Sequence, residues 1–197
     1  LRERIAEKVM KLYNASYDPE SEITVTSGAT EALFEAITAV VHKGDEVIVL
    51  EPAFDSYVPA ITLNGGVPVY IKFKFPEYRI DWDDVKDAVT SKTRLIILNS
   101  PHNPTGAVWS HEDITSLKQI VMDTQVLILS DEVYEHIVFD GKRHASLSSH
   151  PELARRSFVI SSFAKTYHTT GWKVGYCLAP HQMTQELQKV HQFLTFS

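Results

Sequence analysis

The chain has 197 residues, of which 44% are hydrophobic and 22% are charged, and its net charge is −6 at pH 7. This ordinary globular composition excludes a disordered or fibrous protein, and the negative charge gives no electrostatic reason to expect nucleic acid or an anionic membrane as a partner. No apolar run is long enough to span a bilayer, and Cys177 is the single cysteine, so we expect no internal disulfide and a cytoplasmic location.

The chain begins inside a helical pattern, LRERIAEKVMKLY, and ends just after a second one. Neither end resembles a natural terminus, so we expect a piece of a longer protein. Apolar residues between 29 and 41 recur at helical spacing and predict a helix, with Gly44 as its C-cap.

Short β-branched runs bounded by turn residues predict strands, and several are continuously apolar, as in a parallel sheet covered on both faces. These runs lie at 46–50, 67–73, 94–99, 126–130, 157–161 and 175–179. Helical patterns lie between them, notably around 110–122 and 181–195. The alternation predicts one α/β domain over residues 1–197, a three-layer α/β/α arrangement with a mostly parallel central sheet.

Polar segments follow three of the predicted strands. SPHNPTG follows 94–99, DEVY follows 126–130, and SFAK follows 157–161. Ligands of open parallel sheets bind outside the carboxyl ends of the strands, so these segments predict a single site at that edge.

Asp131 comes directly after an apolar strand, so we expect a partly buried carboxylate that needs a cationic or hydrogen-bonding partner. A helix N-cap would satisfy it, and so would a protonated ring nitrogen of a cofactor. Tyr134 presents its phenol to the same side if the chain turns helically there. The alternative for Tyr134 is a half-buried aromatic of the core.

Asn103 lies in a turn that prolines and a glycine make rigid, and it could donate a hydrogen bond to a cofactor oxygen. Without a ligand, the same turn is only a strand-to-helix loop. Gly28, Ala29 and Thr30 stand at the start of a predicted helix, where open N–H groups and the helix dipole favour an anion such as phosphate. Most helix N-termini, however, bind only water.

Lys165 has no charged neighbour until Lys173. An amine partly shielded from water can form a Schiff base with a carbonyl, although an exposed loop lysine is the simpler alternative. Ser162 and Lys173 add a hydroxyl donor and a positive charge, both suited to a phosphate. Together these features describe pyridoxal 5'-phosphate, with a carboxylate keeping its ring nitrogen protonated and a lysine that later moves a proton.

The motifs resemble those of the class I/II aminotransferases, fold-type I enzymes that use pyridoxal phosphate, and most of all the methionine and kynurenine aminotransferase branch. The matching stretches occur in the family's order between positions 23 and 180. They are ITVTSGATEALFEAI, GDEVIVLEPAFDSYVPA, LNSPHNPTGAVW, LSDEVYEHIVF and SSFAKTYHTTGWKVGYCLAP.

The resemblance implies a role for each matching residue. Lys165 would form the Schiff base with the cofactor, and Asp131 would pair with the pyridine nitrogen. Tyr134 and Asn103 would hydrogen-bond the phenolic oxygen, and Phe54 would stack on the ring unless it is ordinary core. The phosphate would be held by Gly28, Ala29, Thr30, Ser162 and Lys173, the last of which replaces an arginine of many relatives.

The resemblance also implies an aminotransferase that acts on an apolar, sulfur-containing or aromatic amino acid, with methionine as the first guess, and on a 2-oxo acid. Family members are homodimers with a C-terminal small domain, whose arginine binds the substrate carboxylate, and an N-terminal arm. We expect both segments to be absent here, and the chain alone to be inactive. A C–S β-lyase, or an effector-sensing domain of a regulator, would keep the same residues.

Two interpretations of the sequence outside this family remain. VLILSDE resembles a Walker B strand of a nucleotide hydrolase, but the chain contains no G-x-x-x-x-G-K-[ST] motif. Four neighbouring residues could bind a metal, although no HExxH or Cys-His spacing supports that reading. They are Asp131, Glu132, Glu135 and His136.

Overall fold

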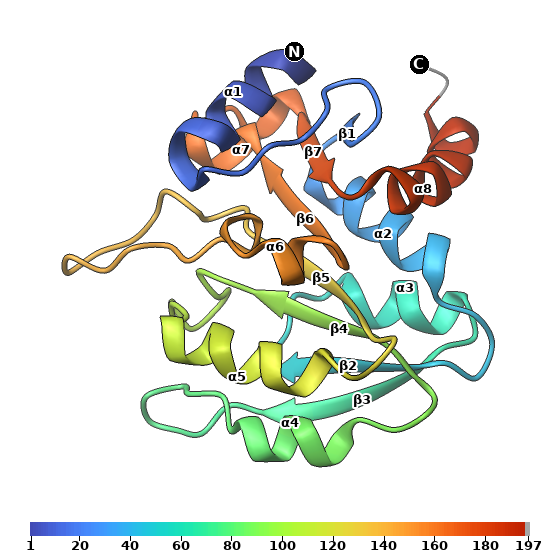
Figure 1. Ribbon diagram of the computed structural model, residues 1–197, viewed down its shortest axis with the longest axis vertical. Coiled ribbons are helices and arrows are strands. Elements are labelled where there is room, and N and C mark those ends of the chain that lie inside the picture. Colours follow the sequence, from blue (N-terminus) through green and yellow to red (C-terminus); the bar gives the residue numbers. More distant parts are fainter. Residues whose placement is uncertain (196–197) are drawn as a thin grey trace.

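A computed structural model describes residues 1–195 as a central sheet with helices on both faces (Figure 1). The strands are β1 (Ile23–Thr26), β2 (Glu46–Glu51), β3 (Val67–Lys72), β4 (Thr93–Asn99), β5 (Leu127–Asp131), β6 (Ser157–Ser162) and β7 (Gly175–Leu178). The strand order is β1-β7-β6-β5-β4-β2-β3. Strands β2 to β6 run parallel to one another, whereas β7 runs antiparallel to both β6 and β1. The predicted mostly parallel α/β sheet is confirmed.

The helices are α1 (Arg2–Tyr13), α2 (Ala29–Val40), α3 (Tyr57–Leu63), α4 (Trp82–Ala88), α5 (His111–Val121), α6 (Pro151–Ala154), α7 (Phe163–Thr166) and α8 (His181–Leu194). Two 3₁₀ turns, η1 (Leu147–Ser149) and η2 (Thr170–Trp172), complete the described elements. None of the helices described in residues 1–195 combines the length and the apolar character needed to cross a bilayer.

The predicted C-cap of α2 was wrong. The helix ends at Val40, and extended Val41 is the C-cap. Gly44 lies in the turn that follows, where its φ of 89° suits glycine and its N–H donates to the carbonyl of Gly65. The β-branched pair at 40–41 already disfavours further helix, so the chain extends before it reaches the glycine.

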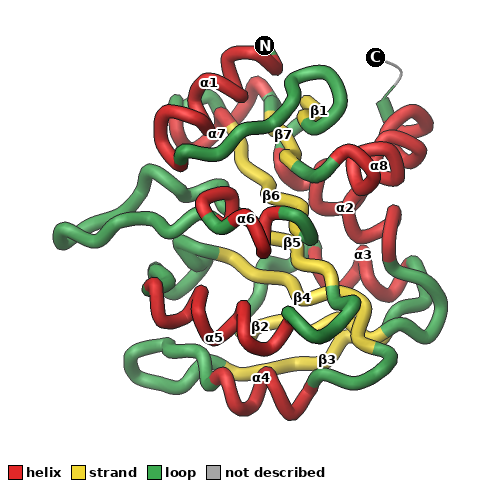
Figure 2. The backbone as a smooth tube through the Cα atoms, viewed as in Figure 1, coloured by secondary structure: helices red, strands yellow, loops and turns green. Residues whose placement is uncertain are grey.

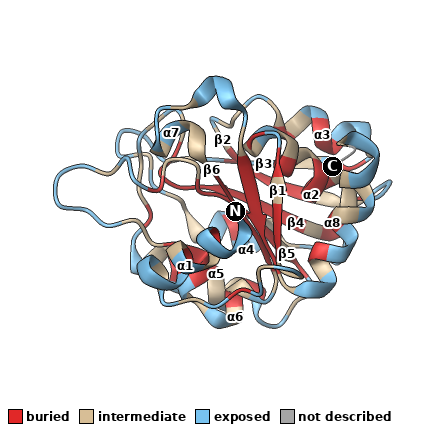
Figure 3. Cartoon of the chain, turned by 90° about the horizontal axis from the view of Figure 1, so that it is seen from above, coloured by how far each residue is buried: buried red, intermediate tan, exposed pale blue. Residues whose placement is uncertain are grey.

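Alternate residues of the central strands pack into two separate cores, one on each face of the sheet. Ile48 and Ile96 pack with residues of α1, α4, α5 and α6, whereas Val47 and Ile97 pack with residues of α2, α3 and α8. Seen from above, buried strands lie between helices whose outer faces are exposed (Figure 3). This two-sided burial explains the continuous apolar runs in the sequence.

The carboxyl ends of the parallel strands meet at one edge of the sheet. The arrowheads of β2, β3 and β4 point to the left in Figure 1, and long loops leave the sheet on that side in Figure 2. Asn99, Asp131 and Ser162 are the last residues of β4, β5 and β6. The fold therefore brings three separate polar segments together, as predicted from the sequence.

Candidate cofactor site

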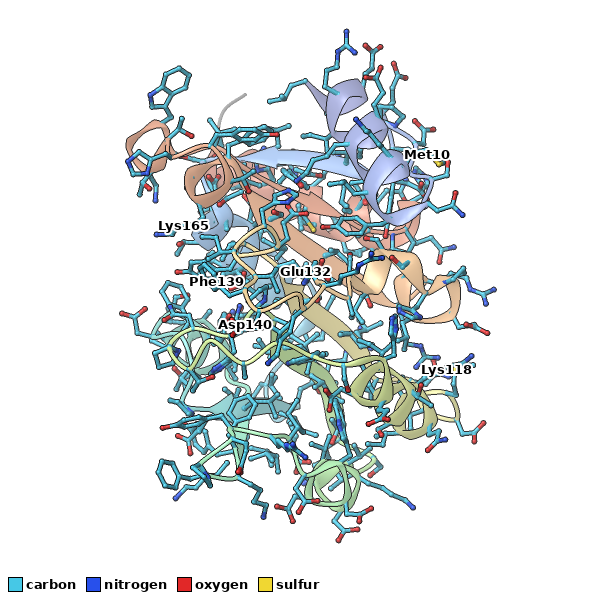
Figure 4. All side chains as sticks on the ribbon, turned by 90° about the vertical axis from the view of Figure 1, so that its left-hand side faces the viewer. Met10, Lys118, Glu132, Phe139, Asp140 and Lys165 are labelled. Carbon is cyan, nitrogen blue, oxygen red and sulfur yellow. The ribbon has the colours of Figure 1, made fainter. Side chains whose placement is uncertain are left out.

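A cavity of about 200 Å³ lies at the carboxyl ends of β4, β5 and β6. Every residue predicted for the cofactor lines it: Gly28, Ala29, Thr30, Phe54, Asn103, Asp131, Tyr134, Ser162, Lys165 and Lys173. Figure 4 looks onto this side of the molecule and labels Lys165 together with Phe139 and Asp140 of the neighbouring loop. The structure thus gathers five distant parts of the chain around one cavity.

Asp131 lies in the wall of this cavity and is 4% exposed. Its Oδ2 accepts a hydrogen bond of 2.6 Å from the Tyr57 hydroxyl, and its Oδ1 accepts a longer one of 3.3 Å from the N–H of Val133. The second contact is a local turn bond, and no helix among the described residues begins at Asp131, so the helix N-cap alternative was wrong. Burial raises the pKa of Asp131 to about 6 despite these two donors, so a cation beside the carboxylate would be stabilising.

Two residues that support the site escaped the sequence analysis. Tyr57, the first residue of α3, is 2% exposed and reaches Asp131 through its hydroxyl without lining the cavity. Asn99 donates from its amide nitrogen to the backbone carbonyl of Asp131 and accepts, at Oδ1, from the N–H of Asn103. Asn99 therefore joins the ends of β4 and β5 to the rigid turn that carries Asn103.

Tyr134 and Lys165 face each other across the cavity. The chain turns after β5, with the N–H of Glu135 donating to the carbonyl of Glu132, so Tyr134 lies on the same side as Asp131, as predicted. The Nζ of Lys165 lies 5.8 Å from the centre of the Tyr134 ring. Lys165 is nevertheless exposed, because the short helix α7 has no buried residue, so the expected shielding from water was wrong for this chain.

The N-terminus of α2 has the features of an anion site. Gly28 is the N-cap with a φ of 87°, and a side chain built on it would lie 3.4 Å from the Nζ of Lys173. An ammonium group beside the positive end of a helix is unfavourable unless an anion binds both. Buried Ser162 lines the same cavity. The start of α2, Lys173 and Ser162 together therefore fit a phosphate group.

Gly175 explains how β7 can approach this helix. A Cβ at Gly175 would lie 2.6 Å from the backbone nitrogen of Ala29, a distance that real Cβ atoms do not show. Only glycine allows the backbone of β7 to pack directly on the start of α2.

The acidic residues that follow Asp131 do not form a metal site with it. Glu132 accepts hydrogen bonds from Ser130 and Leu147 and pairs with His144 at 2.8 Å. Glu135 pairs with Lys8 at 2.6 Å. Within residues 1–195, metal-ligand spacing is found instead at Glu31, Glu35 and His191.

The whole chain, residues 1–197, matches the family profile described as aminotransferase class I and II. It is 51% identical to the methionine aminotransferase of Escherichia coli (strain K12) over 197 residues, which cover 100% of this chain and 51% of that protein. It is also 38% identical over 194 residues to an aspartate aminotransferase of Pyrococcus abyssi, covering 98% of this chain and 50% of that protein.

Solved structures give the same result. The crystal structure of an Escherichia coli protein with a methionine aminotransferase function superposes with a TM-score of 0.98, covering 100% of this chain and 52% of that one. N-succinyldiaminopimelate aminotransferase from Mycobacterium tuberculosis is 38% identical, with a TM-score of 0.96 and coverages of 99% and 51%. The chain spans about half the length of the curated relatives it matches. With its motifs, fold and sequence in agreement, the chain belongs to the family of class I and II aminotransferases.

Proposed function

We propose that the protein is a pyridoxal-phosphate-dependent aminotransferase. It moves an amino group to a 2-oxo acid from an apolar, sulfur-containing or aromatic amino acid, with methionine as the first substrate to test. The observation that carries the proposal is the convergence of Lys165, Asp131 and the N-terminus of α2 on one cavity. The methionine aminotransferase of Escherichia coli, 51% identical, supports the choice of substrate.

The residues of the cavity fit this cofactor in kind and in position. When bound, pyridoxal phosphate supplies an aldehyde that reacts with amines and a protonated ring that accepts electrons. Asp131 would hold the proton on the ring nitrogen, because its buried carboxylate has no cationic partner among residues 1–195. The first N–H groups of α2, with Ser162 and Lys173, would bind the phosphate.

The remaining residues would orient the ring and move the proton. Tyr134 and Asn103 would donate hydrogen bonds to the phenolic oxygen, and Phe54 would cover one face of the ring. Lys165 would hold the cofactor aldehyde through Nζ and, once released, would take the proton that leaves the substrate Cα.

The proposal also includes a homodimer in the full-length protein and a cytoplasmic location. The family resemblance supports the dimer. The single cysteine, Cys177, is buried in β7 and free, which is consistent with a reducing compartment.

The test is a visible spectrum of the full-length protein with pyridoxal phosphate, followed by borohydride reduction and peptide mass mapping. We expect a pyridoxyl adduct on Lys165, and a loss of transamination of about 100- to 10,000-fold in Lys165→Ala. Lys142→Ala, a change in the exposed loop outside the cavity, is the control and should retain activity. An adduct on another lysine would contradict the proposal. If the protein released pyruvate from cysteine conjugates without a 2-oxo acid acceptor, its activity would be β-elimination and not transamination.

A further inference from the structure

One buried carboxylate lies behind the candidate cofactor site without lining its cavity. Glu135 is 4% exposed and follows Tyr134 directly in the turn after β5. Because the chain turns helically there, Asp131 and Tyr134 face the cavity, whereas Glu132 and Glu135 face the opposite side. In the view of Figure 4, Glu132 lies to the right of Lys165 and below helix α1, which is marked by Met10.

Glu135 accepts hydrogen bonds from α1 and β6 and a longer one, of 3.5 Å, from the hydroxyl of Tyr176 of β7. Oε1 accepts from Lys8 of α1 and from the hydroxyl of Ser161 of β6, each at 2.6 Å. Oε2 accepts from the hydroxyl of Tyr13 of α1. Lys8 also donates to the hydroxyl of Tyr176 of β7 at 3.0 Å, which brings the last strand into the same network.

Three members of this network are chain neighbours of residues that line the cavity or pack on the start of α2. Ser161 precedes Ser162, Tyr176 follows Gly175, and Glu135 follows Tyr134. Successive residues of a strand point to opposite faces, so a bond on the far face fixes the backbone that presents the near one. One carboxylate therefore connects the two segments of the cavity wall that carry Tyr134 and Ser162 with the strand that packs on the start of α2.

The electrostatics favour a rigid network. Burial opposes ionisation of Glu135, but Lys8 and the hydroxyl donors outweigh it and keep the pKa of Glu135 below its usual range. A buried charge that is fully hydrogen-bonded has few alternative positions, because each broken bond leaves an unpaired buried group.

We propose that Glu135 is a positioning residue for the cofactor site, acting through the segments that carry Tyr134 and Ser162. This inference rests on the proposed function, since it concerns the binding of pyridoxal phosphate. It gives α1 a role in cofactor binding, although α1 contributes no residue to the cavity.

Two serines on β6 allow a matched test. Ser161 and Ser157 are both buried, at 3% and 0% exposure, and both hydroxyls donate one hydrogen bond. Ser161 donates to Glu135, whereas Ser157 donates to the carbonyl of Leu153, away from the network. Tyr13→Phe provides a second network variant, which removes one donor from α1 and no charge.

The measurements are the dissociation constant of pyridoxal phosphate and the thermal midpoint of the apo protein, both on full-length protein. We expect Ser161→Ala and Tyr13→Phe each to weaken cofactor binding about tenfold, and Ser157→Ala to change it by less than about twofold at a similar cost in thermal midpoint. A purely structural network would lower the thermal midpoint without changing the affinity of the folded protein.

Two results would overturn the inference. In the first, all three variants lose thermal stability and none changes the dissociation constant. In the second, Ser161→Ala alone weakens binding, so the effect is local to β6 and is not shared through Glu135. The wild-type adduct on Lys165 is measured first, and its absence would reject the proposed function rather than the positioning role.

Discussion

Asp131 combines deep burial with a position in the cavity wall, and its ionisation decides what it can bind. The carboxyl has a pKa raised to about 6, chiefly by burial, while the Tyr57 hydroxyl bond favours the charged form. Below that pH it is mostly neutral and offers little attraction to a protonated ring nitrogen. Above that pH it is a buried anion, which a neighbouring cation would stabilise.

We therefore expect the affinity for pyridoxal phosphate to increase as the pH rises through about 6. In Tyr57→Phe the ionised form loses its best donor, so the midpoint of this increase should move up by about one pH unit. The measurement is a titration of the apo protein with cofactor between pH 5 and 8.

The control for this prediction is another buried tyrosine. Tyr17 is 8% exposed, and its hydroxyl donates to Ser148, outside the cavity. Tyr17→Phe should leave the midpoint unchanged. An identical pH profile for wild type and Tyr57→Phe would contradict the role of the phenol.

At the residue scale, the sequence predicted the residues that line the cavity better than the residues that hold them in place. Residues such as Lys165 and Asp131 stand out because polar groups directly after apolar strands are unusual there. Tyr57 and Asn99 did not stand out, since a tyrosine at a helix start and an asparagine at a strand end are common. Their importance depends on a partner in another segment, which local pattern does not contain.

At the scale of secondary-structure elements, the close approach of the β7 backbone to the start of α2 can be tested at Gly175. Gly175→Ala would place a methyl group 2.6 Å from the backbone of Ala29 and of Gly28. Backbone cannot rotate away as a side chain can, so we expect the free energy of unfolding to fall by about 1–3 kcal/mol. Urea denaturation measures this change.

Gly171→Ala serves as the comparison for Gly175→Ala. A Cβ at Gly171 meets nothing within 4 Å, so its effect should stay within about 0.5 kcal/mol. Equal stability of the two variants would show that β7 can shift away from α2.

The sequence predicted the long or strongly apolar elements and missed the short ones. Each predicted strand agrees with its observed bounds to within one residue, because burial on both faces makes the runs continuously apolar. β1 has four residues and α6 and α7 four each, too few for a periodic pattern. Pro59 argued against a helix at 57–63, but it lies in the first turn of α3, where a helix tolerates proline.

For the molecule as a whole, the two cores on opposite faces of the sheet share the same strands. Ile96 and Ile97 are adjacent in β4, fully buried, and belong one to each core. We expect Ile96→Ala and Ile97→Ala each to lower the free energy of unfolding by about 2–5 kcal/mol. Because the sheet links the two cores, each variant should unfold in a single transition.

Circular dichroism and tryptophan fluorescence should report the same denaturation midpoint for each variant. Leu63→Ala, at a side chain that is 77% exposed, is the control and should change stability little. Separate transitions for the two probes would show that one face of the sheet can unfold without the other.

The layer arrangement was predictable from the alternation of apolar runs and helical patterns, but the strand order was not. β7 lies between β6 and β1, and it pairs Ile23 with Leu178. Such a pairing joins segments from opposite ends of the chain. Nothing in the local sequence of either strand specifies its partner.

The antiparallel pairing of β1 with β7 has a consequence for biosynthesis. The loop after β1 leads into α2, whose start lies against Gly175 and Lys173 near the other end of the described chain. During translation the first strand is made early, but its partner leaves the ribosome only after more than a hundred further residues have been added, and such distant pairings form slowly. The end of the cavity beside the start of α2, where we propose that the phosphate binds, is therefore expected to assemble last, and a nascent chain is expected to bind cofactor only near the completion of this sheet.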